Sequence, residues 1–219
     1  MSLRKIVFCI SFSLSVFNFF SQDISSTIQF KWGVLTLDKK TNKTVGLNFS
    51  KPVQLSEGDD IRIYLEPVKN AFIYLYLLDS NNDLMLLFPE NFTQFSKNYS
   101  NKPYYIPDAE SWFTIDENSG TEEFYLIASK VRQPELESLT GKLQKESEKS
   151  TPNSNKINEL KKSIIDELAR LRKENSTNVA VAEKPVSTAG TTRSIGEVTT
   201  NATEVLTENF YAKTLRLEH

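Results

Sequence analysis

Residues 71–90, AFIYLYLLDSNNDLMLLFPE, decide the fold of this chain. Two apolar runs, each too short to span a membrane, flank the polar residues 80–83 (SNND), which tolerate left-handed backbone angles and so suit a turn. This pattern predicts a β-hairpin. The first run, 72–78, is apolar at nearly every position, so its strand is expected to be buried on both faces or central in a sandwich.

Strand patterns also lie on both sides of this hairpin. Residues 61–65 (IRIYL) alternate with period two, which predicts a strand with one buried face. Further strands are expected at residues 28–37, 45–49, 52–55, 112–115, 123–129 and 209–217. The chain is therefore expected to be mainly β and to fold as an antiparallel β-sandwich.

Residues 134–175 have a different, charged and helical pattern. A break at 151–155 (TPNSN) separates a first helix, 135–149, from a second, amphipathic one. The apolar stripe of the second helix consists of Ile157, Leu160, Ile164, Ile165, Leu168 and Leu171. The stripe suits packing onto the sandwich; the alternative, a partner-binding or self-associating coiled coil, normally needs about three to four heptads.

Between this helical hairpin and the last strand, residues 176–204 are rich in Thr, Ser, Ala and Val and contain few large apolar side chains. This composition predicts a flexible linker. We therefore expect a single β-sandwich domain over residues 22–217, with the helical hairpin inserted before the last strand and followed by the linker.

The N-terminus has the pattern of a secretory signal peptide. Arg4 and Lys5 precede an apolar run at 6–20, which is shorter than the roughly 18 or more residues of a membrane span. Cleavage is expected after Ser21, so that residues 1–21 are removed; an uncleaved anchor is the alternative. The mature chain is expected in the periplasm, in the cell envelope or outside the cell, with no membrane insertion after cleavage.

The residues that are missing exclude several chemistries. His219 is the only histidine and the last residue, and Cys9, the only cysteine, lies in the expected signal segment. These two residues cannot supply a Ser-His-Asp or Cys-His mechanism or a His-based zinc site, so no cofactor and no catalysis of these kinds is expected. The formal net charge is −2 and the basic residues are dispersed, which argues against a nucleic-acid partner.

The order of several short motifs resembles a known family. FIYLY at 72–76 and LLFPE at 86–90 are followed by YIP at 105–107 and by EFYLIAS at 123–129. In this arrangement the chain resembles a bacterial family catalogued as domain of unknown function 4384, over about residues 55–129. The resemblance implies an exported or modular β-sandwich that is often joined to other envelope or signalling modules, and it brings no catalytic residues.

Aromatic side chains mark a candidate binding surface in the long segment 90–108 and just after it. The candidate residues are Phe92, Phe95, Tyr99, Tyr104, Tyr105 and Trp112. Such a loop suits recognition of a glycan or a peptide, and equally suits packing of its rings against the sheet.

Two clusters of carboxylates allow sharper hypotheses. Asp79, Asn81, Asp83 and Glu90 have the spacing of a calcium loop, but Leu84 occupies the position that requires Gly, and a polar hairpin turn explains the same residues. Around Trp112, the acids Asp108, Glu110, Asp116 and Glu117 suggest either a glycosidase pair or solvated turn carboxylates.

The sequence therefore favours a non-catalytic exported envelope module that binds a protein or glycan of the cell envelope. The alternatives are a carbohydrate-active hydrolase that uses Asp and Glu, and a structural subunit that assembles through the helical hairpin. No metal site is assigned.

Overall fold

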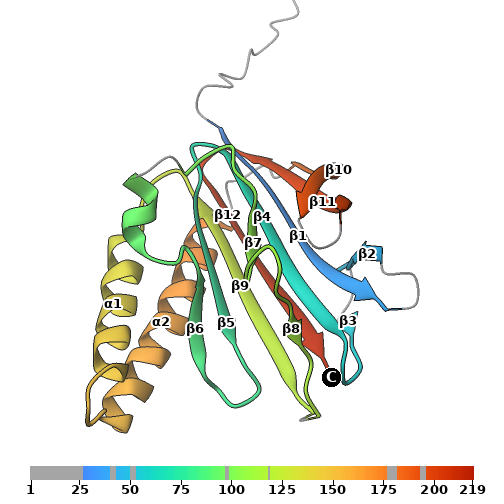
Figure 1. Ribbon diagram of the computed structural model, residues 1–219. Coiled ribbons are helices and arrows are strands. Elements are labelled where there is room, and N and C mark those ends of the chain that lie inside the picture. Colours follow the sequence, from blue (N-terminus) through green and yellow to red (C-terminus); the bar gives the residue numbers. More distant parts are fainter. Residues whose placement is uncertain are drawn as a thin grey trace, which may run out of the picture.

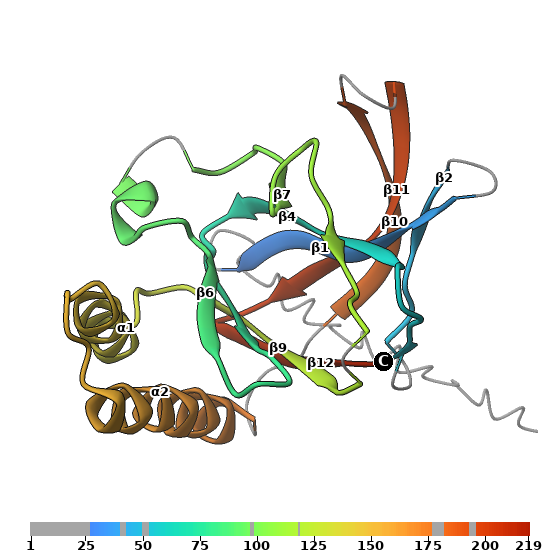
Figure 2. The same cartoon turned by 60° about the horizontal axis from the view of Figure 1, so that its bottom comes forward.

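The computed structural model describes residues 27–39, 43–49, 53–96, 99–117, 119–176, 182–192 and 196–219. The expected signal segment, 1–21, lies outside these residues. Two largely antiparallel sheets face each other, and a pair of helices covers the outer face of one of them (Figures 1 and 2). This arrangement confirms the predicted mainly β, sandwich-type fold. No helix of the described residues is long and apolar enough to cross a membrane.

The first sheet is antiparallel throughout and has the strand order β10-β11-β1-β4-β7. These strands span β1 Ile28–Asp38, β4 Asp60–Lys69, β7 Tyr104–Ile106, β10 Ala182–Thr192 and β11 Gly196–Thr207. Two short strands lie beside this order: β2, Lys43–Gly46, pairs with β1, and β8, Phe113–Thr114, pairs with β4.

The second sheet has the order β3-β12-β9-β5-β6 and contains the predicted hairpin. Its strands span β3 Val53–Gln54, β5 Phe72–Leu78, β6 Leu84–Phe88, β9 Thr121–Ser129 and β12 Phe210–Glu218. The β5–β6 turn uses Asn82 at a φ of 62°, and the Asp79 carboxylate accepts hydrogen bonds from the backbone N–H groups of Asn81 and Asp83 at 3.0 and 2.7 Å. The polar residues thus form the turn that the sequence predicted.

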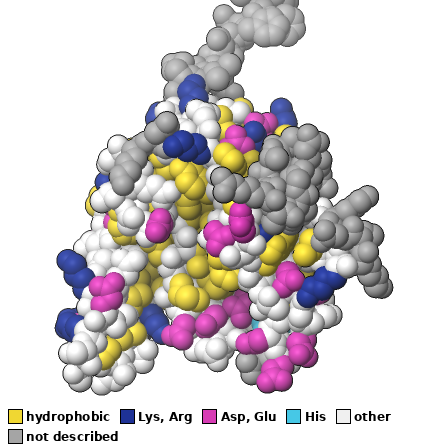
Figure 3. Space-filling view, viewed as in Figure 1, with side chains coloured by type: hydrophobic (Ala, Val, Ile, Leu, Met, Phe, Trp, Pro, Cys, Tyr) yellow, Lys and Arg dark blue, Asp and Glu magenta, His cyan; other side chains and the backbone are white. Residues whose placement is uncertain are grey.

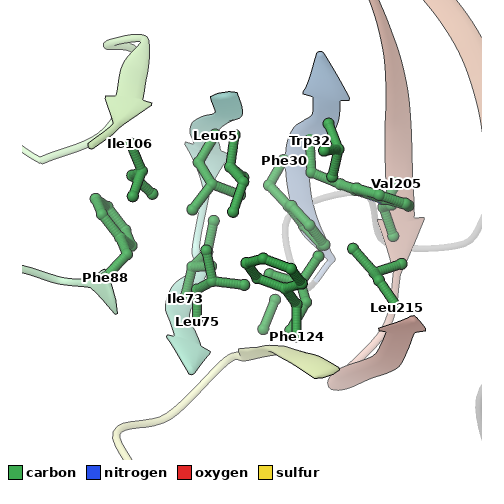
Figure 4. Close-up of a cluster of buried hydrophobic side chains, with 14 of the residues drawn as sticks. Phe30, Trp32, Leu65, Ile73, Leu75, Phe88, Ile106, Phe124, Val205 and Leu215 are labelled. Carbon is green, nitrogen blue, oxygen red and sulfur yellow. The ribbon is translucent and has the colours of Figure 1, made fainter. Parts of the chain in front are cut away.

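The continuous apolarity of β5 is explained by its position between two cores. Ile73 and Leu75 point into the core between the sheets, where they meet Leu65 and Phe124 (Figure 4). Tyr74 and Tyr76 point the other way, toward the helices. Because both faces of the strand are covered, every central position of β5 is buried.

The helical hairpin consists of α1, Pro134–Ser147, and α2, Ser154–Asn175. Asn153 caps α2, since its side chain accepts a hydrogen bond from the N–H of Lys156 at 3.1 Å. The apolar stripe packs against the outer face of the second sheet, and the Tyr76 hydroxyl bonds to Thr140 Oγ1 at 2.8 Å. The hairpin and its packing on the sandwich are therefore confirmed.

The structure differs from the sequence-based expectation for residues 176–204. In place of a flexible linker, β10 and β11 form a hairpin that is paired from Ala182 with Leu206 to Thr192 with Gly196. The helical hairpin accordingly precedes the last three strands rather than the last one. Thr and Val are good strand residues, and the buried side chains among those described in β11 are Ala202, Val205 and Thr207, none of which is large. A search for large apolar side chains therefore missed both strands.

Candidate functional site

A groove of about 490 Å³ lies beside β1, between the two strands that pair with different parts of the same edge of β1. β4 runs along one edge of β1; on the other edge, β11 pairs with Ile28–Trp32 and β2 pairs with Leu35–Asp38. Gly33 lies at the point of divergence and lines the groove. Backbone pairing of β1 with two different strands therefore creates this concave site.

Aromatic rings and a lysine line the groove. The Trp32 ring lies 6.4 Å from the ring of Phe49, centroid to centroid, and the Lys213 ammonium lies 5.0 Å from the Trp32 ring centroid. Trp32 itself is only 4% exposed, so it is held firmly by the core beneath it. Lys213 also lines the groove, and its side chain is 28% exposed.

Glu183, which lines the groove, is held by two polar contacts. Its carboxylate accepts a hydrogen bond from the Tyr211 hydroxyl at 2.8 Å and forms an ion pair with Lys213 at 3.0 Å. Burial, followed by the charge of Glu183 and its hydrogen bond, raises the pKa of Tyr211, whereas the Trp32 indole acts in the opposite direction. Tyr211 therefore remains a hydrogen-bond donor at neutral pH and keeps the carboxylate in place.

Four of the six predicted aromatic residues form a packed cluster instead of an open surface. The Phe95 ring lies 5.3 Å from the ring of Tyr74 and 5.2 Å from that of Tyr99, and the Phe88 ring lies 4.9 Å from that of Tyr104. Phe92 belongs to the short 3-10 helix Phe92–Ser96, and its ring stacks at 6.4 Å on that of Phe95. The packing interpretation of this loop accounts for these contacts.

Tyr99 shows how firmly the loop is attached. It is 6% exposed, and its hydroxyl accepts a hydrogen bond from the N–H of Ile73 at 3.0 Å. The hydroxyl of Tyr104 in turn donates to the Tyr99 carbonyl at 3.0 Å. Burial raises the pKa of Tyr99, so that the ring stays neutral inside the cluster.

The other two predicted residues, Tyr105 and Trp112, lie on the outer face of the first sheet around Arg62. The Arg62 guanidinium carbon is 3.9 Å from the Trp112 ring centroid and 5.8 Å from that of Tyr105. Tyr64, beside Arg62 on the same face, lies 5.6 Å from Tyr105, ring to ring. The structure thus brings the six residues together in two groups, one in the packed cluster and one around Arg62.

Asp79, Asp83 and Asp108, which belong to the two carboxylate clusters, are engaged in local contacts. Besides its turn contact, Asp83 forms an ion pair with Lys161 of α2 at 2.5 Å. Asp108 accepts hydrogen bonds from the N–H groups of Glu110 and Ser111 at 2.7 Å each, and hydrogen bonding, chiefly by Ser111, lowers its pKa. Within the part of the chain that the structure describes, no group of three or more potential metal ligands is found.

His219, which the sequence analysis set aside, is built into the fold. Its backbone exchanges two hydrogen bonds with Gly120, at 2.8 and 3.1 Å, and its ring Nε2 lies 3.3 Å from Glu122. The ring is 4% exposed beside a cavity of about 150 Å³ that Asp79 and Asp116 also line. These contacts attach the end of β12 to the start of β9.

Sequence reasoning missed the groove residues Trp32, Glu183 and Lys213. They come from β1, β10 and β12, and no spacing in the sequence connects them. The one local signal is Gly33, because an isolated glycine inside a strand pattern indicates an irregularity or a close approach at that point.

Comparison with known families supports the resemblance noted from the motifs. Residues 54–132 match the family described as Domain of unknown function (DUF4384). No curated protein and no solved structure matches the chain significantly. The matched residues contain β4 to β9, whereas Trp32, Phe49, Glu183 and Lys213 all lie outside them. The groove is therefore formed by parts of the chain that the family match does not cover.

Proposed function

We propose that this protein is a non-catalytic, exported binding module that holds a glycan or protein of the cell envelope in the groove beside Trp32. The observation that carries the proposal is the groove itself. Its volume of about 490 Å³ lies within the range of about 300–1,000 Å³ that is usual for small-molecule sites. Apolar rings with a few fixed polar groups are the usual lining of such sites.

A saccharide unit suits this lining best. Phe49, which is only partly buried, and the small exposed part of Trp32 offer apolar surface for a sugar ring. The Glu183 carboxylate and the Lys213 ammonium offer an acceptor and a donor for hydroxyl groups. Thr203, which pairs with Trp32 across the two strands and also lines the groove, adds a neutral hydroxyl. Both charged groups are already placed by their contact with each other, so little side-chain ordering is needed when a ligand binds.

Two further features support a binding role over hydrolysis, and a third supports export. Glu183 is held by Lys213 and Tyr211, and Asp108 is engaged in its own turn. Both carboxylates are exposed, whereas a catalytic acid usually lies in buried, apolar surroundings. Export is supported by the basic and apolar pattern of residues 1–21.

The test uses Trp32 as its own reporter. The chain has two tryptophans, so replacing Trp112 with Phe leaves Trp32 as the only one. The W112F chain from Gln22 onward is titrated with oligosaccharides released from the producing cell's envelope, and separately with the envelope protein fraction. We expect saturable quenching by the oligosaccharides.

The variants Lys213→Met and Glu183→Gln are expected to weaken this binding about tenfold each, since a lost charged hydrogen bond costs about 1.5–3 kcal/mol. Lys184→Met, which removes an exposed lysine next to Glu183, serves as the control and is expected to bind like the parent. Quenching by neither fraction, or equal affinity of the Lys213→Met and Lys184→Met variants, would contradict the proposal.

A further inference from the structure

The outer edge of β6 is open. β6 ends the second sheet and pairs with β5 on one side only, and no other strand of the described residues pairs with it. Such an edge presents unpaired backbone N–H and C=O groups and can accept a further strand. Figure 1 shows β6 at this border of the sheet, in front of the helical hairpin.

An apolar groove of about 370 Å³ runs beside this edge. Leu84 and Leu86 of β6 form one wall, and Leu143 of α1 and Ile164 of α2 lie opposite. Met85, between the two leucines, is 43% exposed. A strand added to β6 would therefore place every second side chain in a preformed apolar channel.

Leu87 extends the apolar surface around the edge to the other face of the sheet. Leu86 packs with the helix-facing cluster, whereas Leu87 packs with the core between the sheets, as do Tyr104 and Phe113 across the open side of the sandwich. Figure 3 shows a continuous band of hydrophobic side chains over this part of the molecule, with Asp and Glu side chains along its borders.

The acidic borders indicate the charge of the occupant. Residues 79–119, which include β6, β7 and β8, contain seven carboxylates and two lysines, although the whole chain has a net charge of only −2. Glu90, two residues after the end of β6, is exposed, as are Asp108, Glu110 and Glu117. Glu148 is the one charged residue among those that line the groove. A basic partner would be attracted to this surface and an acidic one repelled.

We propose that the β6 edge binds an extended segment of another protein in which apolar residues alternate with Lys or Arg. The segment adds one strand to the second sheet by backbone hydrogen bonds. Its apolar side chains enter the groove between β6 and α1, and its cations face the carboxylates. A second copy of this chain is a poorer occupant, because two β6 edges would bring their acidic borders together. The β6 edge shares no lining residue with the Trp32 groove, so each surface can be occupied alone.

The probe is a dye-labelled ten-residue peptide in which valine alternates with lysine. Its binding to the chain from Gln22 onward is measured by fluorescence anisotropy, next to a valine–glutamate peptide and a valine–lysine peptide with alternate backbone N-methyl groups. We expect saturable binding of the unmodified valine–lysine peptide that weakens with added salt, and loss of binding for both other peptides.

Met85→Lys is the decisive variant, because a lysine on an edge strand blocks strand addition. Its control is Val45→Lys, which places the same charge at a residue of similar exposure, 45%, on β2. We expect about a tenfold or larger loss of peptide affinity for Met85→Lys alone, with both variants keeping the circular dichroism of the parent.

Three results would overturn the proposal. Equal peptide affinity of the two variants would remove β6 from the interaction, and undiminished binding of the N-methylated peptide would exclude strand addition. A dimer in sedimentation equilibrium that Met85→Lys dissociates would assign the edge to a second copy.

Discussion

The guanidinium carbon of Arg62 lies 3.9 Å from the centroid of the Trp112 ring. From the same position, Arg62 Nε donates to the Ser111 carbonyl at 2.9 Å and Nη1 donates to the Ala109 carbonyl at 2.8 Å. Arg62 is 2% exposed, its Nη2 has no hydrogen-bond partner among the described residues, and burial lowers its pKa. Arg62 of β4 thus anchors the loop between β7 and β8 through its contacts with Ala109, Ser111 and Trp112.

Replacing Arg62 with Met is expected to release this loop. Two carbonyl groups lose their donor and Trp112 loses its cation, so the free energy of unfolding should fall by about 1–3 kcal/mol, measured by urea denaturation. Acrylamide should also quench the fluorescence of Trp112 more strongly, because the indole becomes more exposed. Arg132→Met is the control, because Arg132 lies 5.7 Å from the Phe95 ring but is exposed. An equal effect of both substitutions would show that Arg62 has no special role.

Glu146 is expected to make the stability of the helical hairpin depend on pH. Its side chain, 4% exposed, pairs with Lys149 at 2.7 Å and with Lys156 at 3.0 Å, and these contacts, Lys149 first, lower its pKa from 4.5 to about 2. Because the folded-state pKa is the lower one, the stabilisation is complete above pH 4.5 and is lost as the pH falls toward 2.

The variant Glu146→Gln should therefore melt below the parent at pH 7, and the two melting temperatures should converge toward pH 2. The exposed neighbour Glu148 provides the control, since Glu148→Gln is expected to melt with the parent at pH 7. A difference between Glu146→Gln and the parent that persists unchanged down to pH 2 would rule out this ionic contribution.

A substitution at Leu168 tests whether the helical hairpin packs on the sandwich of its own chain or mediates assembly with other chains. It is 3% exposed and contacts the outer face of the second sheet, so Leu168→Ala should lower the free energy of unfolding by about 2–5 kcal/mol. The mass in sedimentation equilibrium should not change. Leu206→Ala, at a residue that is 39% exposed, should cost less than about 1 kcal/mol. A change of mass with Leu168→Ala would instead favour a structural subunit.

Gly120 lies so close to the β5–β6 turn that it has no room for a side chain. An added Cβ would lie 2.4 Å from the Cβ of Ser80, so Gly120→Ala should destabilise the protein by about 1–3 kcal/mol. Ser80→Gly removes the clashing atom and should restore most of this loss in the double variant, measured by thermal unfolding. If the two substitutions simply add, the contact between Gly120 and Ser80 is not the cause.

The elements that the sequence predicted are those with a regular pattern of large apolar residues. The continuous apolarity of β5 and the apolar stripe of α2 indicate which faces are covered, and such patterns can be recognised in the local sequence alone. β10 and β11 have no such pattern, because small and β-branched residues form most of their pairing. Their strands are specified by backbone pairing with each other and with β1.

The candidate sites were less accessible to prediction than the fold. The aromatic loop could be recognised from its composition, but whether Tyr99 faces ligand or core depends on the hydrogen bond that its hydroxyl accepts from Ile73. The groove depends on β2 and β11 sharing one edge of β1, which is a property of the sheet order. Neither relationship is local in sequence.

The interior position of β12, between β3 and β9, also affects the order in which the sheet can form. β12 pairs with the whole of β9, from Phe210 opposite Ser129 to Glu218 opposite Thr121, so β9 leaves the ribosome long before its partner strand exists. α1 and α2 contact each other through residues close in sequence and can form early. Completion of the second sheet therefore requires pairing between residues that are far apart in the sequence, and this step is expected to be slower than formation of the helical hairpin.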